Sequence, residues 1–453
     1  MEYVLISEKD NVKVCLDNGH KYAVRDIKNG EQIIKYGFPI GVACEDIKKG
    51  EQVHSHNLKT CLAGTLEYTY SPDFEYPEST EPAVINVYER KNGDIGIRND
   101  VWIIPTVGCV NSIAKVLADK TGAFCFTHPY GCSQLGGDLE VTQKVLCGLV
   151  KHPNAGGVLV LGLGCENNNI AEFKKFLGNY DEERIRFLNC QDFDDEIAEG
   201  VKIITELQSL AEKDTRTAVS ISRLKIGLKC GGSDGLSGIT ANPLCGKITD
   251  RLVSMGGTAV LTEVPEMFGA EQVLMNRCVD ENVFTETVGL INNYKEYFIS
   301  HNQPVSENPS PGNKEGGITT LEEKSLGCVQ KGGTAPVTAV LDYGDIAEKA
   351  GLNLLNGPGN DMVAVTNLTA AGCHLILFTT GRGTPLGAPV PTIKIATNSA
   401  IAERKKSWID FDAQTGNQNS LFDLIIETAK GKETKNERYG YREIAIFKDG
   451  VTL

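Results

Sequence analysis

The chain of 453 residues has no apolar run long enough to cross a bilayer. Its longest strongly apolar stretch covers residues 158–163, whereas a membrane-spanning helix needs about 20 residues. The first ten residues, MEYVLISEKD, carry acidic side chains early, which is atypical of a signal peptide. We therefore expect a cytoplasmic protein without a membrane partner.

Positive charge is also scarce. The chain has 45 Lys and Arg against 59 Asp and Glu, a formal net charge of −14. Because nucleic-acid binding needs a basic surface, we expect no nucleic-acid partner. The negative field would also repel a small anion, so an anionic substrate would require a local cluster of Arg, Lys or metal.

Several catalytic signatures are missing. The sequence contains no GxGxxG fingerprint, kinase motif or CxxC pair, and no internal repeat. The 14 cysteines are spread without a tight framework, which indicates reduced thiols that are mostly buried as small apolar groups. A few of them are candidate ligands.

Changes in composition predict three domains. Residues 1–70 alternate short β-type runs with turns and predict a small β domain. Residues 71–83 hold three Pro and four acidic residues and predict an extended linker. Strand and helix patterns alternate in residues 84–215 and again in 216–453, which predicts two α/β domains. The overall fold class is therefore multidomain, combining β and α/β parts.

Two histidines form a candidate metal site. His54 and His56 follow a turn at residues 48–50. On a strand, residues i and i+2 face the same side about 7 Å apart, so the two imidazoles could hold one divalent cation and leave positions open for a substrate. The alternative is a pair of packed or exposed histidines.

Three cysteines occur in glycine-rich turns near the ends of predicted strands. They are Cys132, Cys165 with its neighbour Glu166, and Cys230, which is followed by Asp234. Small neighbours allow a ligand to approach the backbone closely. These thiols could bind iron or an iron–sulfur cluster of the hydratase kind, or each could simply fit a tight turn.

A basic side chain between glycines is a candidate carboxylate site. Arg382 lies in GRGTPLG, residues 381–387, after a predicted buried strand, and a guanidinium so placed suits a bidentate grip on a carboxylate. A phosphate loop is the rival interpretation, but GxxxxGK[ST] is absent. Arg98 and Lys247 are lesser candidates, and a structural role for each remains open.

Proton transfer has three candidates. Asp361 follows a Gly- and Asn-rich turn, His374 comes shortly after it, and His128 ends a predicted strand. Each is of a residue type that serves as general acid or base. A single histidine at the end of a strand is, however, more often structural than catalytic.

Long contiguous stretches resemble one enzyme family over essentially the whole chain. They are PTVGCVN (105–111), YGCSQ (130–134), GLGCENN (162–168), CGGSDGLSGITANP (230–243), TEVPEMFGAEQ (262–272), NPSPGNKEGGITT (308–320) and TTGRGTP (379–385), together with His54-x-His56-Asn57. On these residues the chain resembles the altronate/galactarate dehydratase family.

The resemblance implies an N-terminal β-clip (SAF-like) domain and two further domains. It also implies loss of water from a six-carbon aldonate in hexuronate catabolism, with a divalent metal, Fe(II) or Mn(II). Galactarate-type relatives have a His-Gly-x-Gly-Cys pattern where this chain has His128-Pro129-Tyr130-Gly131-Cys132. That departure favours altronate as substrate and leaves the role of His128 open.

The expected reaction starts with removal of the C2 proton of the acid. A metal held by His54 and His56 would stabilise the charge that develops on the carboxylate, Arg382 would hold that carboxylate, and His128 or His374 would exchange protons. We expect a homo-oligomer, a dimer. The alternatives are a dehydratase of another acid such as galactarate, an iron–sulfur hydratase, and a non-catalytic sugar-acid binding protein.

Overall fold

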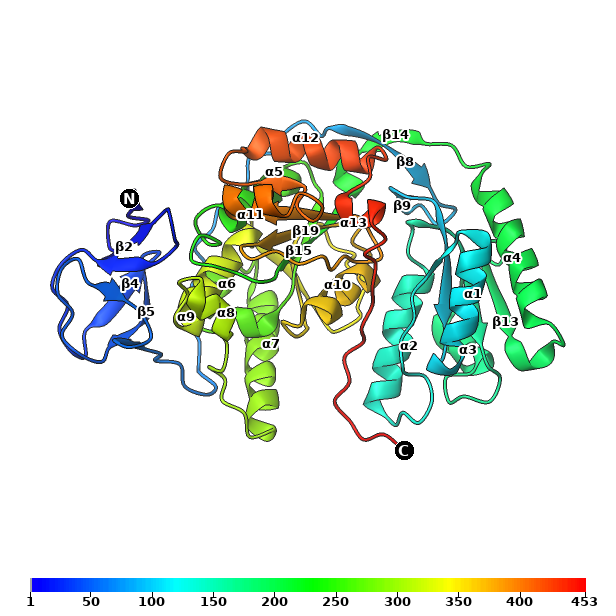
Figure 1. Cartoon of the computed structure of the whole chain (residues 1–453), viewed down its shortest axis with the longest axis horizontal. Coiled ribbons are helices and arrows are strands. Elements are labelled where there is room, and N and C mark those ends of the chain that lie inside the picture. Colours follow the sequence, from blue (N-terminus) through cyan, green and yellow to red (C-terminus); the bar gives the residue numbers. More distant parts are fainter. Residues whose placement is uncertain (1) are drawn as a thin grey trace.

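The computed structural model describes residues 2–453 as three bodies, and their order in space differs from their order along the chain. Figure 1 shows the N-terminal β domain (blue) at one end, the central α/β domain (cyan to green) at the other, and the C-terminal α/β domain between them. The sheets confirm the predicted combination of one small β domain with two α/β domains.

The N-terminal domain consists of two small antiparallel sheets. One has the order β1-β2-β3-β6 and the other β4-β5-β7. Alternation along the strands buries Val12, Val14, Ile33 and Ile40 between them, as a two-layer β packing requires. The strands are β1 Tyr3–Val4, β2 Val12–Cys15, β3 Lys21–Ala23, β4 Gln32–Lys35, β5 Phe38–Ala43, β6 Gln52–Val53 and β7 Leu58–Lys59.

The predicted linker runs over the surface of the C-terminal domain. Residues 60–83 are described and form no helix or strand. Their backbone bonds to that domain at two points, because Asp73 N donates to Asn276 O (2.7 Å) and Thr80 N donates to Ser254 O (3.0 Å). The path therefore leads past the C-terminal domain to the central one.

The central domain has a parallel sheet of order β11-β10-β12-β13. All eight residues of β12 are buried, as expected for a strand covered by helices on both faces. Its elements are β10 Asp100–Pro105, α1 Asn111–Thr121, β11 Phe124–Cys125, α2 Gly137–Val150, β12 Ala155–Gly162, α3 Ile170–Leu177, β13 Ile185–Asn189 and α4 Glu196–Ala211.

A small antiparallel sheet joins the two α/β domains. It has the order β14-β8-β9, with β8 Val84–Glu89, β9 Ile95–Gly96 and β14 Thr217–Ser220. The proposed boundary at residue 215 therefore falls just before a strand that pairs with the beginning of the central domain. We retain the divisions 1–70, 71–83, 84–215 and 216–453 as a proposal.

The C-terminal domain is built on a seven-stranded parallel sheet of order β17-β18-β16-β15-β19-β20-β21. The strands are β15 Lys225–Cys230, β16 Thr258–Leu261, β17 Val337–Leu341, β18 Gly351–Leu355, β19 Leu375–Thr380, β20 Thr392–Ala396 and β21 Phe411–Asp412. The helices are α5 Ala241–Ser254, α6 Glu271–Met275, α7 Glu281–Ser300, α8 Pro311–Glu315, α9 Leu321–Cys328, α10 Asp361–Ala370, α11 Ser399–Arg404, α12 Gln418–Ala429 and α13 Lys435–Arg438. None of the helices within residues 2–453 has the length and hydropathy of a membrane span.

Candidate active site

The strand order of the C-terminal sheet creates a crevice beside Cys230. From β15 the chain moves to β16 on one side, and it later returns to β19 on the other side. Ligands of open parallel sheets bind at such a switch point, outside the carboxyl ends of the strands. A Cβ at Gly231 would lie 2.6 Å from Asp361 Oδ2, so glycine lets that carboxylate reach the strand end.

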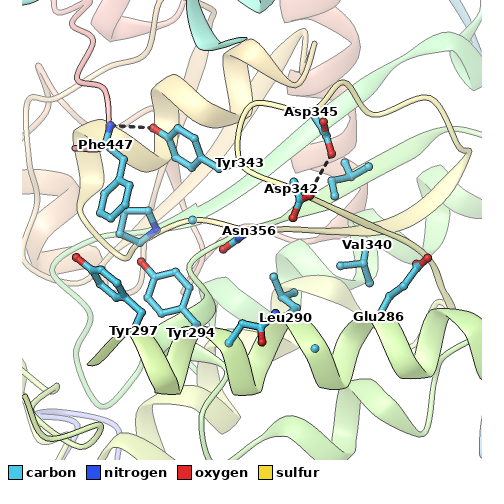
Figure 2. A pocket seen from close by; sticks show the side chains of 15 residues that line it. Glu286, Leu290, Tyr294, Tyr297, Val340, Asp342, Tyr343, Asp345, Asn356 and Phe447 are labelled. Carbon is cyan, nitrogen blue, oxygen red and sulfur yellow. Dashed lines mark hydrogen bonds between the residues drawn. The ribbon is translucent and has the colours of Figure 1, made fainter. Parts of the chain in front are cut away.

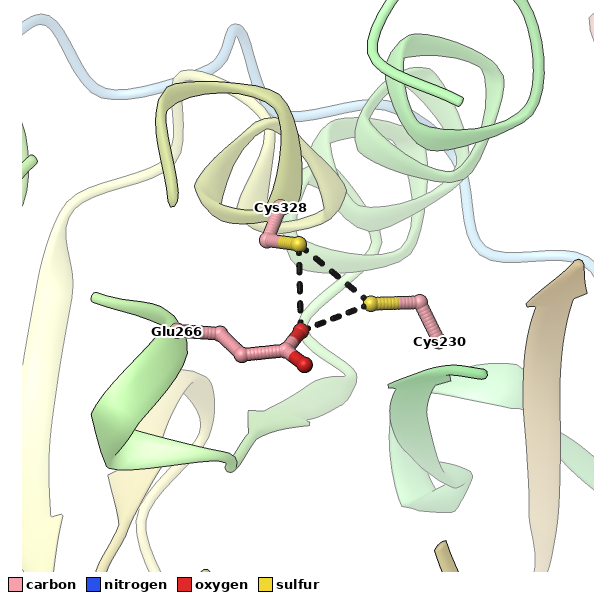
Figure 3. A group of neighbouring side chains, drawn as sticks. All are labelled: Cys230, Glu266 and Cys328. Atoms are coloured by element: carbon pink, nitrogen blue, oxygen red, sulfur yellow. Dashed lines mark hydrogen bonds between the residues drawn. The ribbon is translucent and has the colours of Figure 1, made fainter. Parts of the chain in front are cut away.

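Two thiols and a carboxylate meet at this crevice (Figure 3). Cys230 ends β15, Glu266 ends a 3-10 turn (η4, Val264–Glu266) that follows β16, and Cys328 is the last residue of α9. Glu266 Oε2 lies 3.0 Å from the sulfur of Cys230 and 3.1 Å from that of Cys328, and the sulfurs are 3.4 Å apart. All three side chains are buried. Their donor atoms are close enough to bind one cation.

Buried lysines surround this cluster. Lys331 Nζ lies 3.0 Å from the sulfur of Cys230, and Lys324 Nζ lies 2.8 Å from Glu266 Oε1. Charged groups out of water need such partners, because an unpaired buried charge is strongly unfavourable. The acidic chain thus contains a local group of cations of the kind that an anionic substrate would need.

Glu263 adopts a conformation that is rare for a residue with a side chain. Its φ is +73°, and non-glycine residues in this region cost roughly 1–3 kcal/mol and cluster at functional sites. Its buried carboxylate accepts a hydrogen bond from the backbone N–H of Cys230 (3.0 Å) and pairs with Lys229. Lys229 Nζ also lies 2.9 Å from Asp361 Oδ1. The strained turn therefore ties the ends of β15 and β16 together.

The two thiols titrate at very different pH. A hydrogen bond from Cys328 lowers the pKa of Cys230 to about 6, and nearby ammonium groups act in the same direction. Donating that bond, together with burial, raises the pKa of Cys328 well above its usual value. Cys230 is therefore the more acidic of the two thiols, and a thiolate is the form that binds metals.

The two glutamates also differ. Burial alone would raise the pKa of Glu266, but Lys324, Lys229 and Lys331 outweigh it and hold that pKa well below the usual range. Burial raises the pKa of Glu263 well above its usual value. Glu266 is therefore ionised and can act as a ligand, whereas Glu263 ionises less readily than an ordinary glutamate.

A cavity of about 420 Å³ opens beside the cluster, a size typical of small-molecule sites. Lys324 reaches into it and lies 3.0 Å from Asn308 Oδ1 and 3.2 Å from Asn313 Oδ1. Cys230, Glu266 and Asp361 line the same cavity. Thiol, carboxylate, ammonium and amide groups thus converge on one cavity.

Family comparisons cover all three bodies. The D-galactarate/altronate dehydratase C-terminal model matches residues 221–452, the D-galactarate dehydratase/altronate hydrolase second-domain model matches 87–212, and the altronate/galactarate dehydratase SAF-domain model matches 6–61. The chain belongs to the D-galactarate/altronate dehydratase family. The resemblance drawn from the sequence is confirmed, including the SAF-type N-terminal domain.

Individual relatives within this dehydratase family differ in similarity. Altronate dehydratase of Escherichia coli is 50% identical over 100% of both chains, and that of Bacillus subtilis is 51% identical over 99% of this chain and 94% of its own. Galactarate dehydratase (L-threo-forming) of Escherichia coli is 31% identical over 95% of this chain and 90% of its own.

Four of the predicted site residues lie at the C-terminal-domain crevice. Cys230 and Asp361 line the cavity. Asp234 is buried and accepts a hydrogen bond from Thr397 Oγ1 (2.8 Å), so it supports the neighbouring loops. Arg382 lies next to Gly232, a residue that lines the cavity, and its guanidinium is 3.0 Å from Glu315 Oε2 and about half exposed.

The predicted placement of His54 and His56 on a strand is wrong. Both lie in a turn between β6 and β7, which Asn57 stabilises by accepting a bond from His54 N and donating one to Gln52 O. The Nε2 atom of His54 lies 2.9 Å from the carbonyl oxygen of Lys314, and His56 is exposed. Binding of a metal by this pair stays a prediction.

The predicted proton-exchanging histidines lie away from the crevice. His374 precedes β19, at the opposite end of the sheet from Cys230, and its Nδ1 accepts from Lys225 N (2.9 Å). His128 belongs to the central domain, where its ring lies 2.8 Å from Pro105 O. Burial lowers the pKa of His128 to about 4 and that of His374 well below its usual value. We therefore withdraw both from the chemistry of this site.

The other central-domain candidates are also remote from the cluster. Cys132 and Cys165 are exposed thiols on loops of that domain. Glu166 is buried and accepts bonds from Thr106 Oγ1 (2.7 Å) and Gly164 N (2.7 Å), so it stabilises its own loop. Within residues 2–453, the ligand group around Cys230 includes neither thiol, and metal binding by Cys132 and Cys165 stays a prediction.

Two residues predicted to bind a carboxylate lie outside the cavity. Arg98 is buried and forms a bidentate pair with Glu437, at 2.7 and 3.0 Å. Lys247 is exposed on α5, and its carbonyl accepts from Gln418. Arg98 thus links the start of β10 to α13, and Lys247 lies outside the cavity.

Sequence reasoning missed five residues of the site. They are Lys229, Glu266, Lys324, Cys328 and Lys331. Glu266 had a usable signal, because it follows the apolar run TAVL at 258–261 within a few residues and parallel strands carry functional groups at that end. Nothing local distinguishes Cys328 or Lys331.

Proposed function

We propose that this protein is an altronate dehydratase, which converts D-altronate into 2-keto-3-deoxygluconate and water. The cluster of Cys230, Glu266 and Cys328 among buried lysines, at the switch point of the C-terminal sheet, carries this proposal. Greater identity to two altronate dehydratases than to a galactarate dehydratase supports altronate over galactarate. The substrate is a small sugar acid.

The cavity supplies groups for each step of the elimination. Arg382, beside Gly232 of the cavity wall, binds the carboxylate. Asp361 takes the proton from C2, and Lys324 gives a proton to the departing C3 hydroxyl. The C2–H and C3–O bonds break and a C2=C3 bond forms, so that water leaves. The enol product then moves its hydroxyl proton to C3 and becomes the 2-keto-3-deoxy acid.

Cys230, Glu266 and Cys328 are the residues proposed to hold the family's divalent metal. Two sulfurs and one carboxylate oxygen lie within 4.8 Å of one another, and three protein ligands leave an open coordination position. Thiolate ligands favour Fe(II) over Mn(II). When bound, such a metal supplies Lewis-acid stabilisation of the charge that develops at the substrate carboxylate.

An anaerobic assay tests the proposed function. Protein freed of metal is supplied with Fe(II), Mn(II) or no metal and given altronate, galactarate or mannonate, and the keto acid formed is measured. We expect turnover of altronate with Fe(II) and little without metal. Preferred turnover of galactarate would establish the alternative dehydratase, and binding of altronate without any keto acid would establish a binding protein.

We also propose that the protein acts in the cytoplasm as a homodimer. Closed two-fold assemblies are the commonest oligomers of soluble enzymes. Light scattering of the purified protein would give twice the chain mass of 49.0 kDa for a dimer. A mass of one chain would exclude it.

A further inference from the structure

Residues 443–453 form a strap between the two α/β domains. The segment leaves the C-terminal domain, where Glu443 N donates to Gly387 O (3.1 Å), and reaches the central domain, where Leu453 N donates to Ser133 O (3.0 Å). Figure 1 shows it (red) passing between the C-terminal domain and α2. We call this segment the 443–453 strap.

A buried carboxylate holds the strap to the central domain. Asp138, in the first turn of α2, accepts hydrogen bonds from the backbone N–H groups of Asp449 and Gly450, both at 2.9 Å. Lys448 Nζ lies 3.7 Å from the same carboxylate. Because Asp138 is only 7% exposed, losing these partners would leave a buried charge unsatisfied. The anchor is therefore specific.

The strap places one aromatic ring among three tyrosines. Figure 2 shows Phe447 beside Tyr343, Tyr294 and Tyr297. Ring centroids lie 5.8 Å from Tyr297 and 6.0 Å from Tyr343, and Phe447 N donates to the hydroxyl of Tyr343 (3.2 Å). These distances are those of packed aromatic pairs, so the ring is held in place from both sides.

Phe447 lies where two cavities meet. It lines the cavity of about 420 Å³ that contains Cys230 and Glu266. It also lines a second cavity of about 510 Å³, bounded by α7 and the ends of β17 and β18. Three more residues line both cavities, namely Tyr294, Tyr297 and Pro358. Of these four residues, Phe447 alone comes from the strap.

We propose that Phe447 determines how long a sugar acid the reaction cavity accepts, and that Asp138 is a positioning residue that holds Phe447 there. The substrate class rests on the proposed function. With the ring present, the far end of a bound acid meets an aromatic wall. With the ring removed, the reaction cavity opens into the second one, and a longer hydroxylated chain gains room. Through the strap, the central domain thus fixes the position of a residue that lines the reaction cavity.

Chain-length preference tests the role of Phe447. Wild type, Phe447→Ala and Phe447→Leu are compared on aldonates of five to eight carbons. We expect Phe447→Ala to lower the preference for the six-carbon acid over the seven-carbon acid, as a ratio of kcat/KM, by about 10-fold, and Phe447→Leu to change it less. Tyr439→Ala, which removes an exposed ring, is the matched control. An unchanged ratio in Phe447→Ala would overturn the proposal.

Asp138→Ala and Asp195→Ala test the anchor as a matched pair. Both carboxylates lie at the start of a central-domain helix and accept from backbone N–H groups, but the donor to Asp195 is Ala198 N, in its own helix α4. We expect Asp138→Ala alone to make the chain sensitive to trypsin at Lys448 and to raise KM several-fold with little change in kcat. Equal trypsin sensitivity and equal KM values in the two variants would refute the positioning role.

These results separate the proposal from the proposed function. If wild type converts none of the aldonates, the proposed function fails, and the trypsin comparison still decides whether Asp138 anchors the strap. If wild type converts altronate and the variants match it in chain-length preference and KM, the strap proposal fails alone.

Discussion

The ammonium group of Lys21, in the N-terminal domain, lies 2.8 Å from the carboxylate of Glu323 on α9 of the C-terminal domain. Lys35 lies 2.8 Å from the other oxygen of the same carboxylate, and all three side chains are buried. The carboxylate of Glu322, the residue directly before Glu323, accepts a hydrogen bond from Thr60. The N-terminal domain therefore docks on the helix that also carries Lys324 and Cys328.

Glu323→Gln should destabilise the protein by about 3–5 kcal/mol, because it leaves two buried ammonium groups without their counter-charge. The measurement is the free energy of unfolding in urea. Asp46→Asn is the matched control, because Asp46 pairs with Lys28 on the surface, where ion pairs contribute about 0–1 kcal/mol. Similar losses in both variants would contradict the importance of the buried triad.

The stability that Glu323 contributes should disappear in acid. Burial opposes ionisation, but Lys21 and Lys35 outweigh it and hold the pKa of Glu323 well below its usual 4.5. A depressed carboxylate pKa stabilises the folded state above the unfolded value and ceases to do so as pH falls through the folded one. The difference between wild type and Glu323→Gln should therefore be constant above about pH 5 and shrink below it. A difference that grows in acid would contradict this assignment.

Cys230→Ser and Cys328→Ser should each lose bound metal and more than about 100-fold of turnover, since changes to outer-shell partners of a metal already cost about 10–100-fold. Metal content by mass spectrometry and anaerobic kinetics are the measurements. Cys245→Ser is the control, because Cys245 is equally buried but lies outside the cluster. Full metal content in both variants would contradict the cluster as the metal site and favour His54 and His56 as ligands.

Arg98→Lys should lower stability without affecting substrate binding. Lysine keeps the charge but cannot reproduce the bidentate bonds to Glu437, and we expect a loss of about 2 kcal/mol. Thermal unfolding and the KM for altronate are measured together. A raised KM at unchanged stability would restore Arg98 as a carboxylate-binding residue.

Local elements were predictable from the sequence because their causes are local. The β-type pattern predicted for residues 1–70 and the alternating strand and helix patterns predicted for 84–215 and 216–453 match the elements observed there. Backbone hydrogen bonding and the period of apolar residues depend on near neighbours along the chain. The error at His54 arose where a side chain, that of Asn57, closed a turn in place of the expected strand.

The sequence by itself determined the element types, the three-part organisation and the family, through long motifs that need no partner elsewhere in the chain. Only the tertiary structure decided the site. Cys230 and Glu266 are 36 residues apart in the sequence, and Glu266 and Cys328 are 62 residues apart. They meet because β15 lies between β16 and β19. Strand order and burial are properties of the packed molecule, and no pattern within one segment encodes them.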